Sequence, residues 1–204
     1  MIIGQVPKHI SEPIRATLLN NPYFPWYLCT CTTEYNSDYT DSLVDEYSGE
    51  ESQFMHTVVN NSGNLVSQIA YETCVNDMLG YISKNYDIPE YQKLRRIKIN
   101  LLPKTHNKYK YHTPHVDCTS PHWTLIYYVN DSDGPTYLFN EKYNGLKQKL
   151  SINQSIEPEE GKFILFDGLY YHASSSPINH DWRSVINVNF LVGYESFTKG
   201  LTDS

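Results

Sequence analysis

The chain has 204 residues, of which 40% are hydrophobic and 19% charged, and a formal net charge of −7. This length favours a single domain, residues 1–204, with a hydrophobic core of its own. No secretory leader or membrane-length apolar run is evident, and four cysteines without C-x-x-C spacing do not suggest a disulfide framework, so we expect a cytoplasmic protein that is neither secreted nor membrane-spanning.

The first elements predicted along the chain are a strand over residues 26–32 and a helix over residues 64–86. The helix is indicated by apolar residues at mostly helical spacing, namely Leu65, Ile69, Val75, Met78, Leu79 and Ile82. Asn64 or Ser62 can cap its start, and Pro89 prevents its continuation. One helix is therefore expected in the N-terminal part, about residues 1–92.

Charge is segregated on either side of this helix. Residues 34–51 contain seven acidic residues and no Lys or Arg, whereas residues 93–110 contain seven basic residues and no acidic one. The acidic segment has the composition of a solvated loop. The basic segment allows two interpretations, a strand with a charged outer face or a surface that guides an anionic substrate, and the sequence leaves both open.

After the helix the apolar pattern changes to a period of two, which is typical of strands. Strands are predicted over residues 96–102, 115–117, 123–130, 136–139, 162–166 and 184–192. Many short strands after one packed helix favour a mainly β (α+β) fold, a jelly roll with helical support on one side. The jelly-roll core is expected over about residues 93–195.

The pattern His115-Val116-Asp117 is a candidate metal site. Two residues one apart on a strand point to the same face, so His115 and Asp117 can bind one ion, and a distant His172 can complete the set. Two imidazoles and one carboxylate are the ligands of non-haem Fe(II) oxygenases, and they leave positions open for substrate and oxygen. With eight histidines in the chain, the H-x-D pattern alone is weak.

Arg183 makes the metal hypothesis more specific. On the strand predicted over residues 184–192 it shares a face with Val185 and Asn187. An inward Arg needs an anion, and the far carboxylate of a dicarboxylic 2-oxo acid would satisfy it. Tyr128 could share that carboxylate if it also faces inward. Each residue also has a purely structural interpretation. Arg183 could be a surface residue that ends a strand, and Tyr128 could be an aromatic residue of the core.

The ordered motifs resemble a known family. They are His115-Val116-Asp117, residues 125–130 (LIYYVN), 133–139 (DGPTYLF) and 161–166 (GKFILF), His172 and Arg183. Together, over roughly residues 97–192, they are similar to Fe(II)/2-oxoglutarate-dependent dioxygenases of the prolyl 4-hydroxylase-like branch, including its small phage-encoded members. Two positions depart from that pattern: Pro135 follows Gly134 where a second Gly is usual, and Leu102 stands where an inward Tyr is often found, with Asn100 nearby.

The resemblance implies a double-stranded β-helix, Fe(II) on His115, Asp117 and His172, and 2-oxoglutarate on Arg183 with help from Tyr128. Asn187 is a further candidate contact that could compensate for the missing Tyr. The implied reaction hydroxylates a substrate with 2-oxoglutarate and O₂, with ascorbate as a candidate reductant. Peptidyl proline is the substrate that the family favours, in a protein or peptide, and the basic segment keeps nucleic acid or another anionic substrate open. A phage-encoded member would act in the host cytoplasm.

Two alternatives compete with this enzyme. One is a non-catalytic jelly-roll binding module that keeps metal ligands for structural reasons. The other is a cupin-like iron enzyme that does not use 2-oxoglutarate, and Arg183 argues against it. Succinate formation separates both from the enzyme hypothesis.

Overall fold

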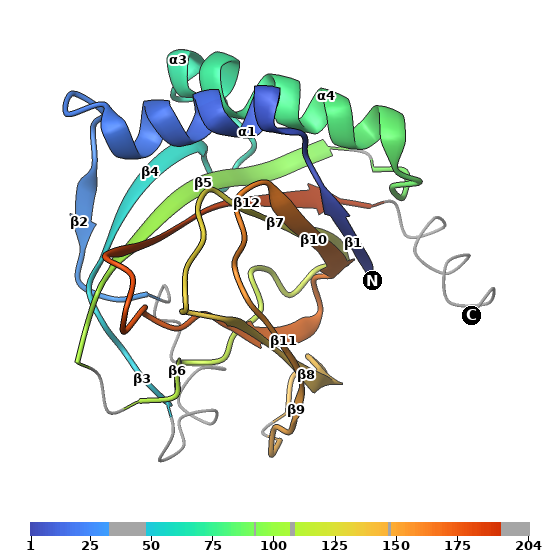
Figure 1. The fold of residues 1–204 in the computed structure, drawn as a ribbon. Helices are drawn as coiled ribbons and strands as arrows, with labels where there is room; N and C mark the ends of the chain where they lie inside the picture. Colours follow the sequence, from blue (N-terminus) through green and yellow to red (C-terminus); the bar gives the residue numbers. More distant parts are fainter. Residues whose placement is uncertain (33–47, 92, 107–108, 147, 193–204) are drawn as a thin grey trace.

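A large curved sheet has helices on one face and a smaller sheet on the other (Figure 1). The computed structural model describes residues 1–32, 48–91, 93–106, 109–146 and 148–192. Among these residues the large sheet has seven strands, all paired antiparallel, in the spatial order β1 (Ile2–Gln5), β10 (Lys162–Asp167), β7 (His122–Tyr128), β12 (Trp182–Leu191), β5 (Lys93–Pro103), β4 (Gln53–Val59) and β2 (Tyr27–Cys29).

The smaller sheet lies opposite the inner face of the large one. Its strands, in spatial order, are β11 (Tyr170–Ala173), β8 (Thr136–Lys142) and β9 (Ile152–Ile156), and a short parallel pair joins β3 (Ser48–Gly49) to β6 (Tyr111–His112). Two antiparallel sheets facing each other, with helices outside, confirm the expected jelly-roll class. None of the described helices is both long and apolar enough to span a bilayer.

The helical layer is larger than the sequence predicted. Its segments are α1 (Lys8–Arg15), the π-helical turn η1 (Ala16–Asn20), α3 (Gln68–Ala70), the π-helical turn η2 (Tyr71–Val75) and α4 (Asn76–Asn85). The predicted helix is confirmed from Gln68 onward, and the segment α1 to η1 was not expected. It contains Pro13, a residue that usually argues against a helix interior.

The start of the predicted helix was wrong by one turn. Leu65 forms a β-bridge with Val59, and the backbone N–H groups of Val66 and Ser67 donate to the carbonyl of Val58. These contacts hold the segment against β4, so neither Asn64 nor Ser62 caps the helix. Leu65 and Ile69 are accordingly exposed, at 44% and 76% of their surface, instead of lying in the core.

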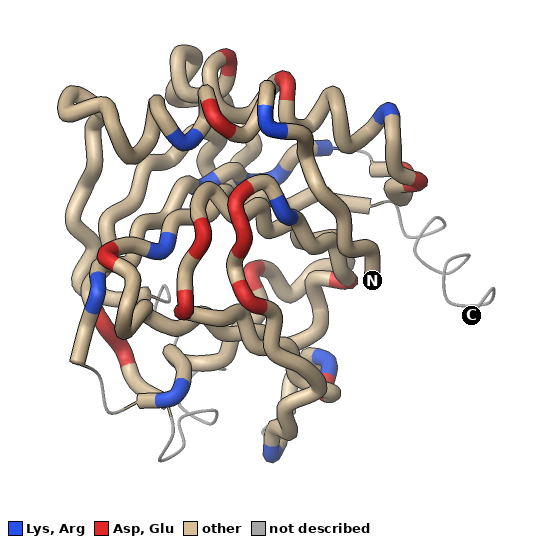
Figure 2. The backbone as a smooth tube through the Cα atoms, in the orientation of Figure 1, with Lys and Arg blue, Asp and Glu red and all other residues tan. Residues whose placement is uncertain are grey.

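The outer face of the large sheet supplies the main hydrophobic core against the helices. On β5, Ile97 and Ile99 point into this core, where they meet Met78 and Ile82 of α4. Strand alternation turns the residues between them toward the inner face. Figure 2 shows the basic positions that lie along β5 beneath the helices. The helices therefore decide which face of β5 looks into the space between the sheets.

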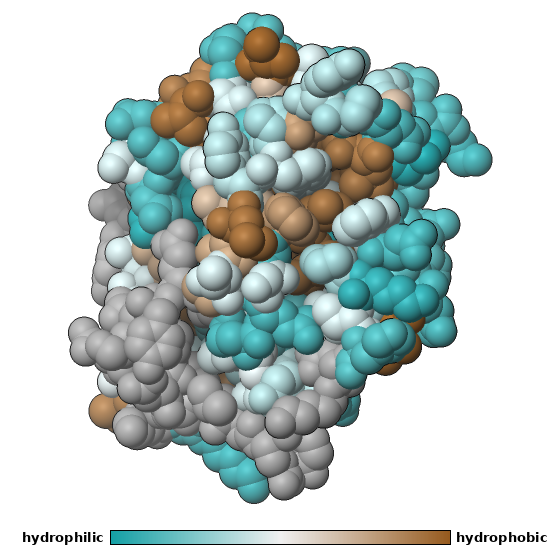
Figure 3. Space-filling model, turned by 90° about the vertical axis from the view of Figure 1, so that its left-hand side faces the viewer, coloured by the Kyte–Doolittle hydropathy of each residue, from teal (hydrophilic) through white to brown (hydrophobic). Residues whose placement is uncertain are grey.

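The side of the molecule at the β2 edge of the sheet carries exposed apolar surface. Figure 3 shows apolar side chains gathered in the middle of this face and bordered by polar ones. Strand β2 itself exposes Tyr27 and Leu28, at 61% and 64%. Of the sequence predictions, most of the acidic segment (its residues 34–47) and the end of the jelly-roll core (residues 193–195) lie outside the described residues.

Candidate active site

The three predicted metal ligands converge. One ligand atom from each of His115, Asp117 and His172 can be chosen so that all lie within 4.8 Å of one another. The prediction that His115 and Asp117 share the face of a regular strand was wrong. His115 instead forms an isolated antiparallel bridge with His172, with backbone N–H···O distances of 2.9 and 3.0 Å, and Asp117 lies in a bend just after it. This bridge to β11 brings the two imidazoles together.

The imidazoles are oriented as metal ligands require. Nδ1 of His115 donates to the carbonyl of Thr113 at 3.1 Å, and Nδ1 of His172 donates to that of Tyr170 at 3.4 Å. A carbonyl only accepts, so these bonds leave the lone pair of each Nε2 available for an ion. The Nε2 atoms lie 3.9 Å and 3.6 Å from the oxygens of Asp117.

This donor set fits a divalent transition metal. Ligands at about 2.1 Å from an octahedral ion are about 3 Å apart when adjacent, so the set needs only a small contraction. Burial lowers the pKa of His172 to about 4, so this imidazole is neutral near pH 7. A neutral imidazole is the form that binds a metal.

The carboxylate of Asp117 is buried and held by donors on both oxygens. Oδ2 accepts hydrogen bonds from Asn187 at 3.2 Å, Asn189 at 2.9 Å and Thr124 at 3.4 Å. Oδ1 forms an ion pair with Arg96. Burial acts to raise the pKa of Asp117, but Arg96 and the two histidines hold it well below its usual range, so the carboxylate is ionised.

Arg183 is buried at the other end of the same inner face. It is 2% exposed, its Nε donates to the carbonyl of Gly134 at 2.7 Å, and one terminal nitrogen donates to Oγ1 of Thr136 at 2.7 Å. Burial lowers the pKa of Arg183 to about 10, and the guanidinium remains charged near pH 7. Among the described residues no carboxylate forms an ion pair with it, so its buried charge calls for an anion from outside the chain.

Tyr128 and Asn187 lie near Arg183 and the triad but make other contacts than expected. The hydroxyl of Tyr128 donates to Thr136 at 2.9 Å, and the guanidinium of Arg183 lies 5.9 Å from its ring centre. Tyr128 does not line the cavity, so it supports the Arg183 end through Thr136. Asn187 does line the cavity, but its amide donates to Asp117 at the metal end.

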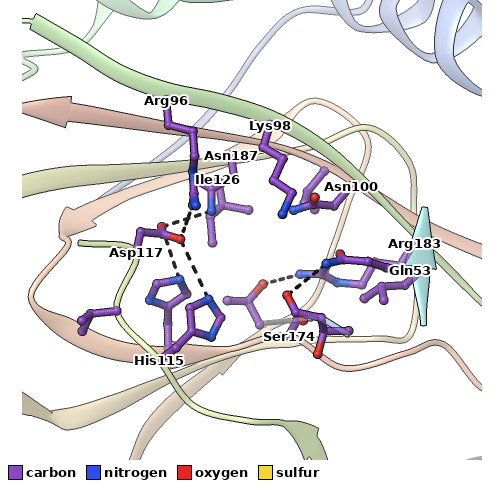
Figure 4. Close-up of a pocket in the computed structure, with 16 residues that line it drawn as sticks. Gln53, Arg96, Lys98, Asn100, His115, Asp117, Ile126, Ser174, Arg183 and Asn187 are labelled. Carbon is purple, nitrogen blue, oxygen red and sulfur yellow. Dashed lines mark hydrogen bonds and ion pairs between the residues drawn. The ribbon is translucent and has the colours of Figure 1, made fainter. Parts of the chain in front are cut away.

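One cavity connects the two ends. Figure 4 shows Asp117 and His115 on one side of it, Arg183 on the other, and the side chain of Lys98 pointing into the space between them. The wall is mostly polar, and it is formed by Thr32, Gln53, Arg96, Lys98, Asn100, Leu102, His115, Val116, Asp117, Ile126, Thr136, His172, Ser174, Arg183, Val185 and Asn187.

Strand β5 supplies the cavity residues that the sequence analysis did not assign. Arg96 and Lys98 line the cavity, so a charged outer face was the wrong interpretation for these two positions. Their direction follows from the alternation of β5, because Ile97 on the same strand packs under the helices. The sequence did contain a signal for this direction: the period of two on β5 separates the Ile residues from Arg96 and Lys98, and the predicted helix needs the Ile face for packing. Ser174 was also missed, and its hydroxyl bonds to Nδ1 of the buried His112 at 2.9 Å.

Comparison with solved structures finds the same fold. An oxidoreductase of the 2OG-Fe(II) oxygenase family from Burkholderia pseudomallei superposes with a TM-score of 0.54 at 15% identity, over 83% of this chain and 74% of that one. A prolyl-4-hydroxylase from Pseudomonas putida matches at 12% identity with a TM-score of 0.43, over 69% of this chain and 72% of that one. The non-heme alpha ketoglutarate dependent epimerase SnoN from nogalamycin biosynthesis matches at 10% identity with a TM-score of 0.49, over 71% of this chain and 64% of that one.

Sequence comparisons add no closer relative. No family model matches the chain, and no curated protein matches it. At these identities the structural similarity concerns the fold. The chain therefore shares the jelly-roll fold of a 2OG-Fe(II) oxygenase and carries, within one cavity, a His-Asp-His cluster and a buried arginine.

Proposed function

We propose that the protein is an Fe(II)- and 2-oxoglutarate-dependent oxygenase that hydroxylates its substrate. The observation that carries the proposal is the pairing of two features in one cavity. A His-Asp-His cluster lies at one end, and Arg183, buried and without a described carboxylate partner, lies at the other. A metal site alone would suit many proteins. A buried cation across the cavity suits a co-substrate with two carboxylates.

Different residues would bind the two ends of such a co-substrate. His115, Asp117 and His172 would bind Fe(II), and Arg183 would pair with the far carboxylate, held in place by Gly134 and Thr136. When bound, the iron and 2-oxoglutarate supply the activation of O₂.

The apolar part of the cavity wall, which includes Leu102, Ile126 and Val185, would exclude water from the co-substrate. Leu102 stands where the resembled family often has an inward Tyr. At the Arg183 end of the cavity, Arg183 and Thr136 would therefore make the polar contacts with the far carboxylate of 2-oxoglutarate.

For the substrate we propose a polar molecule, with peptidyl proline in a protein or peptide as the first class to test. The cavity wall also carries amide and cationic side chains, including Gln53, Lys98 and Asn100. Such a wall suits hydrogen-bonding groups better than an apolar ligand. Small anionic molecules and nucleotides are the other classes to compare, and we propose the cytoplasm as the site of action.

The decisive experiment measures succinate formation from 2-oxoglutarate with Fe(II), alone and with proline peptides, free amino acids or nucleotides, with and without ascorbate. We expect slow succinate formation without substrate and stimulation by one class. His115→Ala and Asp117→Ala should abolish both, whereas His180→Ala, an exposed histidine bonded to Asp133, should change neither. Protein that binds metal and 2-oxoglutarate but forms no succinate with any substrate would instead be a binding module.

A further inference from the structure

The ion pair between Arg96 and Asp117 joins a cavity cation directly to a residue of the proposed metal site. Arg96 lies on β5 and Asp117 in the bend after His115, and their side chains are 12% and 3% exposed. Water therefore screens the pair only weakly, and the Coulomb interaction is larger than at the surface. Figure 4 shows the guanidinium of Arg96 beside the carboxylate that also faces the imidazoles.

The other donors to Asp117 are different in kind. Asn187, Asn189 and Thr124 all bond to Oδ2 and are all neutral. They come from the rigid neighbouring strands β12 and β7, so they fix the orientation of the carboxylate whether or not an ion is present. Of the hydrogen-bond donors to Asp117 among the described residues, Arg96 alone brings a full positive charge, and it is bound to Oδ1.

A divalent cation at this site must compete with that charge. The ion either shares the carboxylate with Arg96, in which case two cations lie next to each other, or displaces the guanidinium and breaks the ion pair. Both outcomes are unfavourable for the metal-bound form and do not affect the metal-free form. By linkage, a contact that stabilises the metal-free state more than the metal-bound state weakens metal binding.

We propose that Arg96 is the internal counter-cation of the metal-free site, a positioning residue that keeps Asp117 paired until a metal arrives and thereby lowers the affinity for divalent metal. The proposal rests on the metal site of the proposed function. Under this proposal, Arg96 lowers the affinity for metal, whereas the neutral donors raise it. Removing a residue that only orients a ligand weakens metal binding, whereas removing a competing cation strengthens it.

The test measures the binding of Mn²⁺ to metal-free protein by titration calorimetry at pH 8, where protonation of the carboxylate does not compete. We expect Arg96→Gln to bind Mn²⁺ at least tenfold more tightly than the original protein, and to unfold at a lower temperature in the absence of metal. Arg96→Lys keeps the charge and should stay within threefold of the original affinity. Arg96→Met keeps an unbranched side chain like the aliphatic part of Arg, without the charge, and provides the same test if the Gln variant does not fold.

The control is Arg95→Gln, which makes the same change of charge on the same strand. Arg95 bonds to the carbonyl of Asn61, away from the cavity, and its removal should leave the Mn²⁺ affinity unchanged. Unchanged or weaker binding in Arg96→Gln overturns the proposal, as does equal tightening in Arg96→Lys. Because neither 2-oxoglutarate nor turnover enters the measurement, this result is independent of whether the protein forms succinate.

Discussion

The side-chain amide of Asn189 donates to Oδ2 of Asp117 at 2.9 Å, across 72 residues of sequence. Asn189 lies on β12, the strand that also carries Asn187 and Arg183 on its inner face. One rigid strand thus orients the carboxylate at the metal end and supplies the cation at the other end. A single element therefore contributes to both ends of the cavity.

Asn189→Ala should weaken metal binding by about 10- to 100-fold, because outer contacts that orient a ligand typically contribute this much. The amide is fully buried and also bonds to Thr124 and Asn187, so its loss removes the shortest of the three hydrogen bonds to Oδ2 and loosens the other two donors. Calorimetric titration with Mn²⁺ measures the change. Asn140→Ala, an exposed amide bonded to Ser151, is the control and should leave the affinity unaltered.

Arg183→Met should raise the KM for 2-oxoglutarate by about 10- to 100-fold, the value of a charged hydrogen-bonded pair. The reason is that the far carboxylate loses its cation. A 2-oxo acid without that carboxylate, such as 2-oxobutyrate, should be affected much less. CO₂ formation, which both acids give on oxidative decarboxylation, measures the ratio, and an equal loss for both would contradict the assigned role of Arg183.

Tyr128→Phe should have a smaller effect than Arg183→Met. Its hydroxyl bonds to Thr136 and not to the cavity, so the variant loses one buried hydrogen bond, or about 1 kcal/mol of folding free energy. We expect the KM for 2-oxoglutarate to rise less than tenfold, through a looser Thr136. Urea unfolding and steady-state kinetics check both values. A loss as large as that of Arg183→Met would mean that Tyr128 contacts the co-substrate directly.

Stability should fall in acid through Asp133. Although partial burial acts to raise its pKa, the backbone N–H groups of Ile178, Asn179 and His180 and the side chains of the last two donate to its carboxylate, and they hold the pKa well below the usual range. A depressed folded pKa adds stability that is present above the unfolded pKa of about 3.9 and is lost as the pH falls below it.

Asp133→Asn should therefore be less stable than the original protein by about 2 kcal/mol at pH 7, with the difference shrinking as the pH falls from 5 to 3. Urea unfolding across this range measures it. A difference that does not change with pH would show that the charge of Asp133 is not what stabilises the turn.

Gly134 and Gly80 should respond oppositely to replacement by Ala. A Cβ at Gly134 would lie 2.5 Å from the backbone oxygen of Ser175, so we expect a loss of about 2 kcal/mol and weaker 2-oxoglutarate binding, because Arg183 bonds to the carbonyl of Gly134. Gly80 lies in α4 with open space around it, and Gly80→Ala should gain about 0.5–1 kcal/mol. Thermal and urea unfolding of both variants measure the contrast.

The sequence by itself determined the features that depend on local spacing. The period of two located the main inner strands, and helical spacing located the helix that ends at Asn85. The types of His115, Asp117, His172 and Arg183 defined a chemistry before any geometry was known, because few reactions need two imidazoles, one carboxylate and an inward guanidinium together.

Tertiary structure decided what each side chain meets. Local spacing could not show that His115 is placed by its bridge to His172, or that Arg96 and Lys98 face the cavity, because the inward face of β5 depends on which side the helices cover. It could not show that Tyr128 bonds to Thr136 or Asn189 to Asp117. Asn189 and Asp117 lie 72 residues apart in the chain, and Tyr128 and Thr136, although close in sequence, lie on different sheets, so both contacts depend on how the two sheets face each other.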